Sequence, residues 1–166
     1  MKRLVSILIG ATLLSLSLAC AASAGPFEDS LAAFKSGDKA EGYRLTRIAA
    51  EQGNPAAQFV LGQFLSIGDG VEQNYKEAAV WFRRAAEQGD DAAEEALAAA
   101  YFFGRGVPQD YIEAHKWANL AVANSVDEIA RETHVTLLET IAEKLTREQV
   151  VEAQKLAREW KAKRER

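Results

Sequence analysis

Cysteine is almost absent from this 166-residue chain, and histidine is scarce. The one cysteine, Cys20, lies in an apolar run near the N-terminus, so no disulfide within the chain can hold it together. His115 and His134 are the only histidines, and neither has a second histidine or a cysteine at metal-ligand spacing. No acid–base pair, nucleophile or phosphate-binding motif stands out beside them. We therefore predict no catalytic residue, no metal site and no cofactor.

Excess positive charge is also lacking. The chain has 20 basic and 24 acidic residues, and residues 25–126 hold only 9 of the basic ones against 15 acidic ones. Nucleic-acid binding needs a clustered basic surface, and adhesion to anionic lipid needs the same kind of charge. We predict neither nucleic acid nor a membrane surface as a partner.

Long hydrophobic runs are missing too, apart from an uncharged stretch over residues 4–19. That stretch is too short and too rich in serine for a permanent membrane span. It follows a positively charged start and precedes Ala22-Ser23-Ala24, which is the pattern of a secretory signal peptide. We predict cleavage after Ala24, export to the periplasm and no membrane span after processing. The alternative is a lipoprotein acylated at Cys20, although Ser17 stands where such sites usually have leucine.

The central part of the chain contains two copies of one sequence repeat, at an offset of 36 residues. A fixed period of this length is the mark of a solenoid built from stacked supersecondary units. The matching positions include glycines, a glutamine, a tyrosine, a glutamate and a tryptophan. They are Gly68, Gly70, Val71, Gln73, Tyr75, Glu77, Ala78 and Trp81, which return as Gly104, Gly106, Val107, Gln109, Tyr111, Glu113, Ala114 and Trp117.

Each unit predicts two antiparallel helices. In the first unit, Asn54 can cap a helix that begins at Pro55, the two glycines after Ile67 reverse the chain, and Asn74 opens a second helix. The expected divisions are a signal peptide at 1–24, a solenoid at 25–126 and a two-helix C-terminal cap at 127–166. Within the solenoid we expect a shortened unit at 27–54 and full units at 55–90 and 91–126. Two capping boxes, beginning at Ser125 and Thr146, are expected to open the two helices of the cap.

The pattern A-A-x-F-x-L-G, followed by G-x-G-V-x-Q-[ND]-Y-x-E-A-x-x-W, resembles the Sel-one-like repeat family, a relative of the tetratricopeptide repeat. The resemblance covers residues 27–126. It implies an all-α fold, namely a short right-handed α-solenoid of antiparallel helix pairs. It also implies a non-enzymatic scaffold or adaptor that binds a protein or peptide, here in the bacterial envelope.

A solenoid recognises partners along its concave face, which the first helix of each pair lines. If the tetratricopeptide-like register holds, the groove-facing residues are Phe59, Gln63, Glu95, Ala99 and Phe102. Phe59 and Phe102 could be exposed aromatic anchors for a peptide. The alternative is that both rings are buried against the next helix.

Two other functions stay open at this stage. One is a periplasmic regulator that restrains a membrane sensor. The other is an enzyme acting on cell-wall material or β-lactams, because some cysteine-rich relatives in the family that this chain resembles are linked to penicillin binding. This chain lacks their paired cysteines and any Ser-x-x-Lys. The identity of the partner and the oligomeric state are not encoded in any recognisable motif.

Overall fold

The computed structural model describes residues 25–164, so the predicted signal peptide and Cys20 lie outside the described residues. Within this range the chain forms eight helices and no strand, which confirms the all-α prediction. The helices are α1 (Pro26–Lys35), α2 (Lys39–Glu51), α3 (Pro55–Ile67), α4 (Tyr75–Glu87), α5 (Asp91–Phe103), α6 (Tyr111–Asn124), α7 (Glu128–Ala142) and α8 (Arg147–Arg164).

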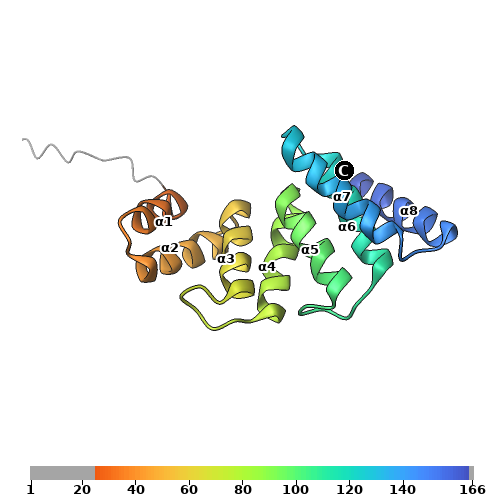
Figure 1. Ribbon diagram of the computed structural model, residues 1–166. Helices are drawn as coiled ribbons and strands as arrows, with labels where there is room; N and C mark the ends of the chain where they lie inside the picture. Colours follow the sequence, from red (N-terminus) through yellow and green to blue (C-terminus); the bar gives the residue numbers. More distant parts are fainter. Residues whose placement is uncertain (1–24, 165–166) are drawn as a thin grey trace, which may run out of the picture.

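The helices are stacked in a row, in chain order (Figure 1). From α1 to α6 each helix packs against the one before it and the one after it. The last two helices depart from this order, because α7 and α8 both pack mainly against α6, and α7 also reaches α5. Both helices of the C-terminal cap, α7 and α8, therefore pack against α6, the last helix of the array.

Helix starts repeat with the period of the sequence. Asp38, Asn74 and Asp110 cap the second helix of each unit, and Asn54 and Asp90 cap the first helices of the two full units. Each side chain accepts a hydrogen bond at 2.8–3.1 Å from a backbone N–H two or three residues further on. Such a cap satisfies an N–H group that the helix itself leaves without a partner. The spacing from Asp38 to Asn74 also places α2 in the repeat, as the second helix of the shortened unit.

The turn inside each full unit is likewise built twice. Gly68 and Gly104 end α3 and α5 with φ of +80° and +68°, a left-handed conformation that glycine adopts without steric cost. The amides of Gln73 and Gln109 donate to a carbonyl in the last turn of the preceding helix, at 2.9 and 2.7 Å. The repeated glutamine therefore ties the loop to the end of the helix that it leaves.

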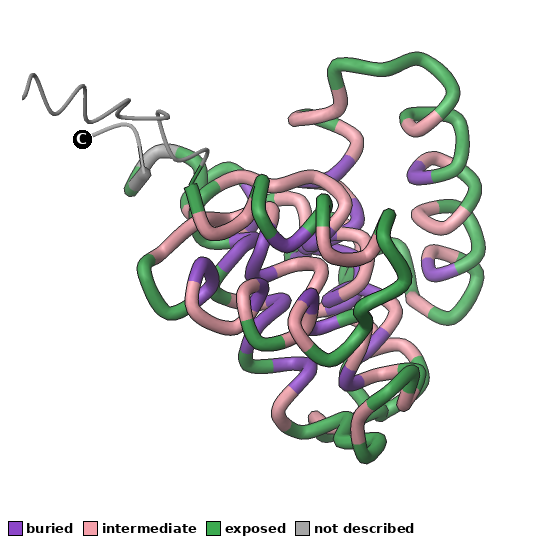
Figure 2. The backbone as a smooth tube through the Cα atoms, turned by 90° about the vertical axis from the view of Figure 1, so that its left-hand side faces the viewer, coloured by how far each residue is buried: buried purple, intermediate pink, exposed green. Residues whose placement is uncertain are grey.

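The core runs along the middle of the stack, between the helices, while the loops and outer turns are exposed (Figure 2). Leu61 and Leu97 are fully buried, as are alanines at the helix contacts such as Ala57, Ala93 and Ala118. Small side chains allow helix axes to approach at the near end of the usual range of about 8–10 Å. The alanine-rich composition thus gives tight stacking.

Trp81 and Trp117 have equivalent surroundings, as expected of one unit written twice. Both rings are buried, and each indole N–H donates to the glutamate one turn earlier, Glu77 at 3.3 Å and Glu113 at 3.2 Å. A buried Trp N–H needs such a partner. Trp117 additionally meets the edge of Trp160 from α8, with ring centroids 5.3 Å apart. The second unit thus uses its tryptophan to hold the cap.

The predicted capping box at the start of α8 is present. The backbone N–H of Thr146 donates to Gln149 Oε1 at 2.9 Å, and the Gln149 N–H donates back to Thr146 Oγ1 at 3.3 Å. The box predicted at Ser125 is wrong. Asp127 caps α7 instead, and the Ser125 hydroxyl bonds to groups on α5, α6 and α7.

Candidate binding groove

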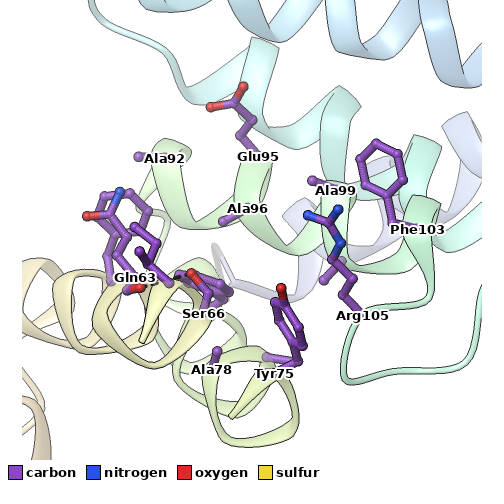
Figure 3. A pocket seen from close by; sticks show the side chains of 15 residues that line it. Gln63, Ser66, Tyr75, Ala78, Ala92, Glu95, Ala96, Ala99, Phe103 and Arg105 are labelled. Atoms are coloured by element: carbon purple, nitrogen blue, oxygen red, sulfur yellow. Dashed lines mark hydrogen bonds between the residues drawn. The ribbon is translucent and has the colours of Figure 1, made fainter. Parts of the chain in front are cut away.

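A cavity of about 360 Å³ opens between α3, α4 and α5, and we call it the α3/α5 groove. Its floor is the face of α5 that carries Ala92, Ala96 and Ala99, spaced one helical turn apart (Figure 3). These side chains are small, so they leave space for the cavity between α5 and α3. The walls are larger side chains of α3, of α4 and of the loop that follows α5.

Four of the five predicted groove residues line this cavity, namely Phe59, Gln63, Glu95 and Ala99. Phe102 does not, because it is half-buried and packs against Phe103 and Tyr111, with ring centroids 4.9 and 5.5 Å apart. Phe59 is half-buried as well, and its ring lies 6.0 Å from that of Phe82. Whether these residues contact a partner stays a prediction.

The exposed apolar side chains at the groove were not among the predicted residues. Ile67 is 70% exposed, Phe103 is 55% exposed and Tyr75 is 37% exposed, and all three line the cavity. Ile67 and Phe103 occupy the same repeat position, the last residue before the turn glycine. That repetition was the available sequence clue. A pair of large apolar side chains at an exposed helix end, around one cavity, is a surface that favours contact with another molecule.

Arg105 provides the positive charge of the groove. Its guanidinium lies 4.9 Å from the ring centroid of Phe103 and 5.8 Å from that of Tyr75, beside both rings in Figure 3. No carboxylate within residues 25–164 forms an ion pair with it. Stacking on aromatic faces orients a guanidinium and leaves its N–H groups available to a carboxylate.

Glu95 lies at the other end and connects the groove to the cap. Its carboxylate is 3.4 Å from Nε2 of His134, whose Nδ1 is 2.6 Å from the Ser125 hydroxyl. The same hydroxyl lies 3.0 Å from Asp91 Oδ2 and 3.0 Å from the Ala121 carbonyl. His134 is 3% exposed, so it is a buried link between α5, the end of α6 and α7. This chain of polar contacts fixes where α7 sits relative to the groove.

Glu95 also lines a second cavity of about 560 Å³ between α5 and α7. This cavity includes exposed residues of α7, among them Ile129, Glu132 and Thr136. The two cavities share Glu95, so side chains of α3, α5 and α7 line one continuous surface, which we call the recognition face. The cap extends this face as well as holding the end of the array.

The environment of His115 differs from that of His134. His115 is 2% exposed, burial lowers its pKa, and its Nδ1 has no hydrogen-bond partner among the described residues. Desolvation disfavours the charged imidazolium, so His115 is a neutral packed side chain. Residues 25–164 contain no group of three His, Cys, Asp or Glu side chains placed to hold a metal ion.

No helix in the described part of the chain has both the length and the apolar character that a membrane span requires.

The fold is a short α-solenoid whose full units are helix pairs of 36 residues with a shared groove. Comparison with known proteins identifies the family. A family model for the Sel1 repeat matches residues 30–54, 55–90 and 91–125, and the chain belongs to this family, as its motifs predicted.

Two solved structures support this assignment. One is a protective antigen present in uropathogenic Escherichia coli strains that displays an SLR fold, with 31% identity over 81% of this chain and a TM-score of 0.73. This chain spans only 29% of that antigen. The other is a Sel1 repeat protein from Oxalobacter formigenes, with 33% identity over 67% of this chain and 86% of that one, and a TM-score of 0.59. No curated protein matches the chain significantly.

Proposed function

We propose that this protein is a non-enzymatic scaffold of the bacterial envelope that holds a segment of a partner protein in the α3/α5 groove. A Sel1 repeat array is a scaffold of the kind that mediates protein interactions. The observation that carries the proposal is the exposure of Ile67 and Phe103 around a cavity lined by the alanines of α5. Covering these side chains would remove apolar surface from water, at about 25 cal/mol per Å².

The size of the groove fits such a ligand. A volume of about 360 Å³ lies at the lower end of the usual range for binding clefts, and it suits a few side chains better than a large cofactor. Polar groups at its edges, such as Gln63, Ser66 and the Tyr75 hydroxyl, can pair with a peptide backbone.

Retention of partners from an envelope extract tests this function. Phe103→Ser and Ile67→Ser should each reduce retention of a specific protein, whereas Val80→Ser and Val151→Ser should not. The two control valines are 50% and 56% exposed and do not line the groove, so all four changes replace an exposed apolar side chain by serine. Because Phe103 also contacts Phe102 and Arg105, urea unfolding of each variant establishes that it is folded. Equal retention by all four variants would exclude the groove as the binding site.

The envelope location is part of the proposal and rests on the N-terminal sequence. We expect the mature chain to begin at Gly25. Mass spectrometry of the protein purified from its natural host measures the start directly. A first residue at a diacylated Cys20 would replace the periplasmic assignment with a membrane-anchored one, and an intact Met1 would remove export altogether.

A further inference from the structure

The loop that carries Arg105 is fixed against the preceding unit. A Cβ added to Gly106, which has φ of +77°, would lie 2.0 Å from the Tyr75 carbonyl oxygen, so the backbone packs directly on the start of α4. The Arg105 N–H also donates to the Ala100 carbonyl at 2.9 Å. The backbone at Arg105 is therefore held beside the groove, and the contacts of its guanidinium with Tyr75 and Phe103 make this end of the groove positive.

The other end of the recognition face is negative. Glu95 lines both the α3/α5 groove and the adjoining cavity, and Glu132 lines the latter. Figure 3 shows the Glu95 carboxylate directed away from Ala96 and well apart from Arg105. The Glu95 carboxylate lies 3.4 Å from His134 Nε2, whereas Glu132 is exposed and forms no ion pair within residues 25–164. A basic side chain of a ligand could approach both carboxylates.

Between these ends lies an apolar stretch of defined length. Along α5 the path from Glu95 to Arg105 is about 15 Å, because each helical residue rises about 1.5 Å. An extended peptide covers this distance in about five residues, and reaching Glu132 adds one or two more. Exposed side chains flank both ends, namely Ile67 and Phe103 near Arg105 and Ile129 beyond Glu95, so the ligand chain can continue past the groove in both directions.

We propose that the groove selects an internal, extended segment of a partner protein that carries an acidic side chain, then apolar side chains, then a basic side chain. The acidic side chain meets Arg105, the apolar ones cover the alanine floor beside Ile67 and Phe103, and the basic one meets Glu95 and Glu132. The opposite charges at the two ends fix the direction in which the segment lies. This inference rests on the proposed function and specifies its ligand.

Peptide titrations followed by amide NMR shifts test the charge order. The first probe is acetyl-Glu-Ser-Leu-Ser-Leu-Ser-Lys-amide, in which alternate side chains face the protein. The second probe carries Lys at both ends, because a probe with Glu and Lys exchanged could meet the same two charges by lying in the reverse direction, and the third carries Gln at both places. The first probe should bind the wild-type protein about tenfold more tightly than either of the others, with the largest shifts in α3 and α5. Electrostatic complementarity sets orientation in this way.

Charge reversal sharpens the test. Arg105→Glu should abolish the preference for the first probe and favour a probe with Lys at both ends. Arg84→Glu is the matched control, because Arg84 is also exposed and also stacks on an aromatic ring, Trp81 at 4.5 Å, but lies outside the groove. Circular dichroism establishes that both variants are folded.

The outcomes separate the two levels of the proposal. If the three probes bind equally, and Phe103→Ser abolishes their shifts, the groove is a binding site but the charge order is wrong. If Arg84→Glu changes the preference as much as Arg105→Glu does, the assignment of Arg105 is wrong. If no probe shifts any groove resonance, the charge order is overturned, and the proposed function then stands or falls on the retention experiment with the serine variants.

Discussion

The two glycine loops have the same sequence pattern and the same turn, yet they contact the rest of the molecule differently. In the first unit, Asp69 reaches back to Lys39 at the start of α2, at 2.9 Å, and this ion pair is exposed. In the second unit, Arg105 occupies the place of Asp69 and stacks on Tyr75, which occupies the place of Lys39. The repeated residues thus make the turn, and the unrepeated ones decide whether a loop makes a surface ion pair or contributes a charge to the groove.

The helix contacts show the same division. Gly62 in α3 lies under the ring of Phe82, and a Cβ at Gly62 would lie 2.6 Å from that ring. The equivalent pair in the second unit is Ala98 and Ala118, which are both buried. One unit uses a large and a minimal side chain where the other uses two small ones, so the helices remain close in both. The ring of Phe82 also helps to line the groove, which the second pair cannot do.

The largest effect is expected from the loops. Gly70 and Gly106 share a φ of +77°, but a Cβ at Gly70 would meet nothing within 4 Å, whereas one at Gly106 would meet the backbone of Tyr75. Gly70→Ala should cost about 1–2 kcal/mol for the left-handed conformation alone. Gly106→Ala adds overpacking and should cost about 3 kcal/mol or more in total. Urea unfolding measures both, and equal losses would show that the second loop is not docked.

The helix pair gives the next largest effect. Gly62→Ala should destabilise the protein by about 1–3 kcal/mol, because the added methyl group meets the Phe82 ring. In the presence of Phe82→Ala the same change should cost little, since the second unit already carries alanine at both places. A double-mutant cycle should therefore show a coupling of about 1 kcal/mol or more. Additive losses would mean that the two positions do not compensate each other.

A smaller difference concerns pH, because His115 replaces Ala79 of the first unit. Burial lowers the pKa of His115 from its usual value near 6.5. Below pH 6.5 the unfolded chain then binds more protons than the folded chain, so stability falls as the pH decreases. His115→Ala should lose less stability than the wild-type protein between pH 8 and pH 5. Parallel pH profiles for the two proteins would contradict the assignment of a buried neutral His115.

The smallest effect is expected at the ion pair of the first loop. Lys39 and Asp69 have side chains that are 65% and 48% exposed, and surface pairs contribute about 0–1 kcal/mol. Lys39→Ala should change the free energy of unfolding by no more than a few tenths of a kcal/mol, and 0.5 M salt should remove most of the difference. A loss comparable to that of Gly106→Ala would mean that both loops are docked to a similar extent.

Local features of the sequence predicted most of the fold. The positions of Asn54, Asn74 and the turn glycines set the helix ends, since capping and left-handed turns depend on adjacent residues alone. Ser125 was wrongly assigned as a cap because a serine and an aspartate two residues apart are equally plausible from sequence. The choice of Asp127 leaves the Ser125 hydroxyl to bond His134, and that contact exists only once α7 has packed.

The groove was less accessible to sequence reasoning. The register placed Phe59, Gln63, Glu95 and Ala99 near one another, because they share a face of consecutive first helices. The sequence offered one clue for Phe103, its correspondence to Ile67 in the repeat, whereas the packing of Phe102 against Tyr111 depends on how the last turn of α5 meets α6. Polar pairs between distant residues, such as the amide of Gln88 that donates to the buried Gln58 at 2.8 Å, also depend on tertiary packing and carry no local pattern.

The most direct test of the account is site-specific photo-cross-linking in living cells. A photoreactive side chain at Gln63 or Ala99, inside the groove, should form a covalent product with one partner protein, and the product should be lost when Phe103→Ser is added. The same side chain at Val80 or Val151 should give no such product. A product that forms equally from Val80 and from Gln63, or one that survives Phe103→Ser unchanged, would show that the partner binds elsewhere on the array.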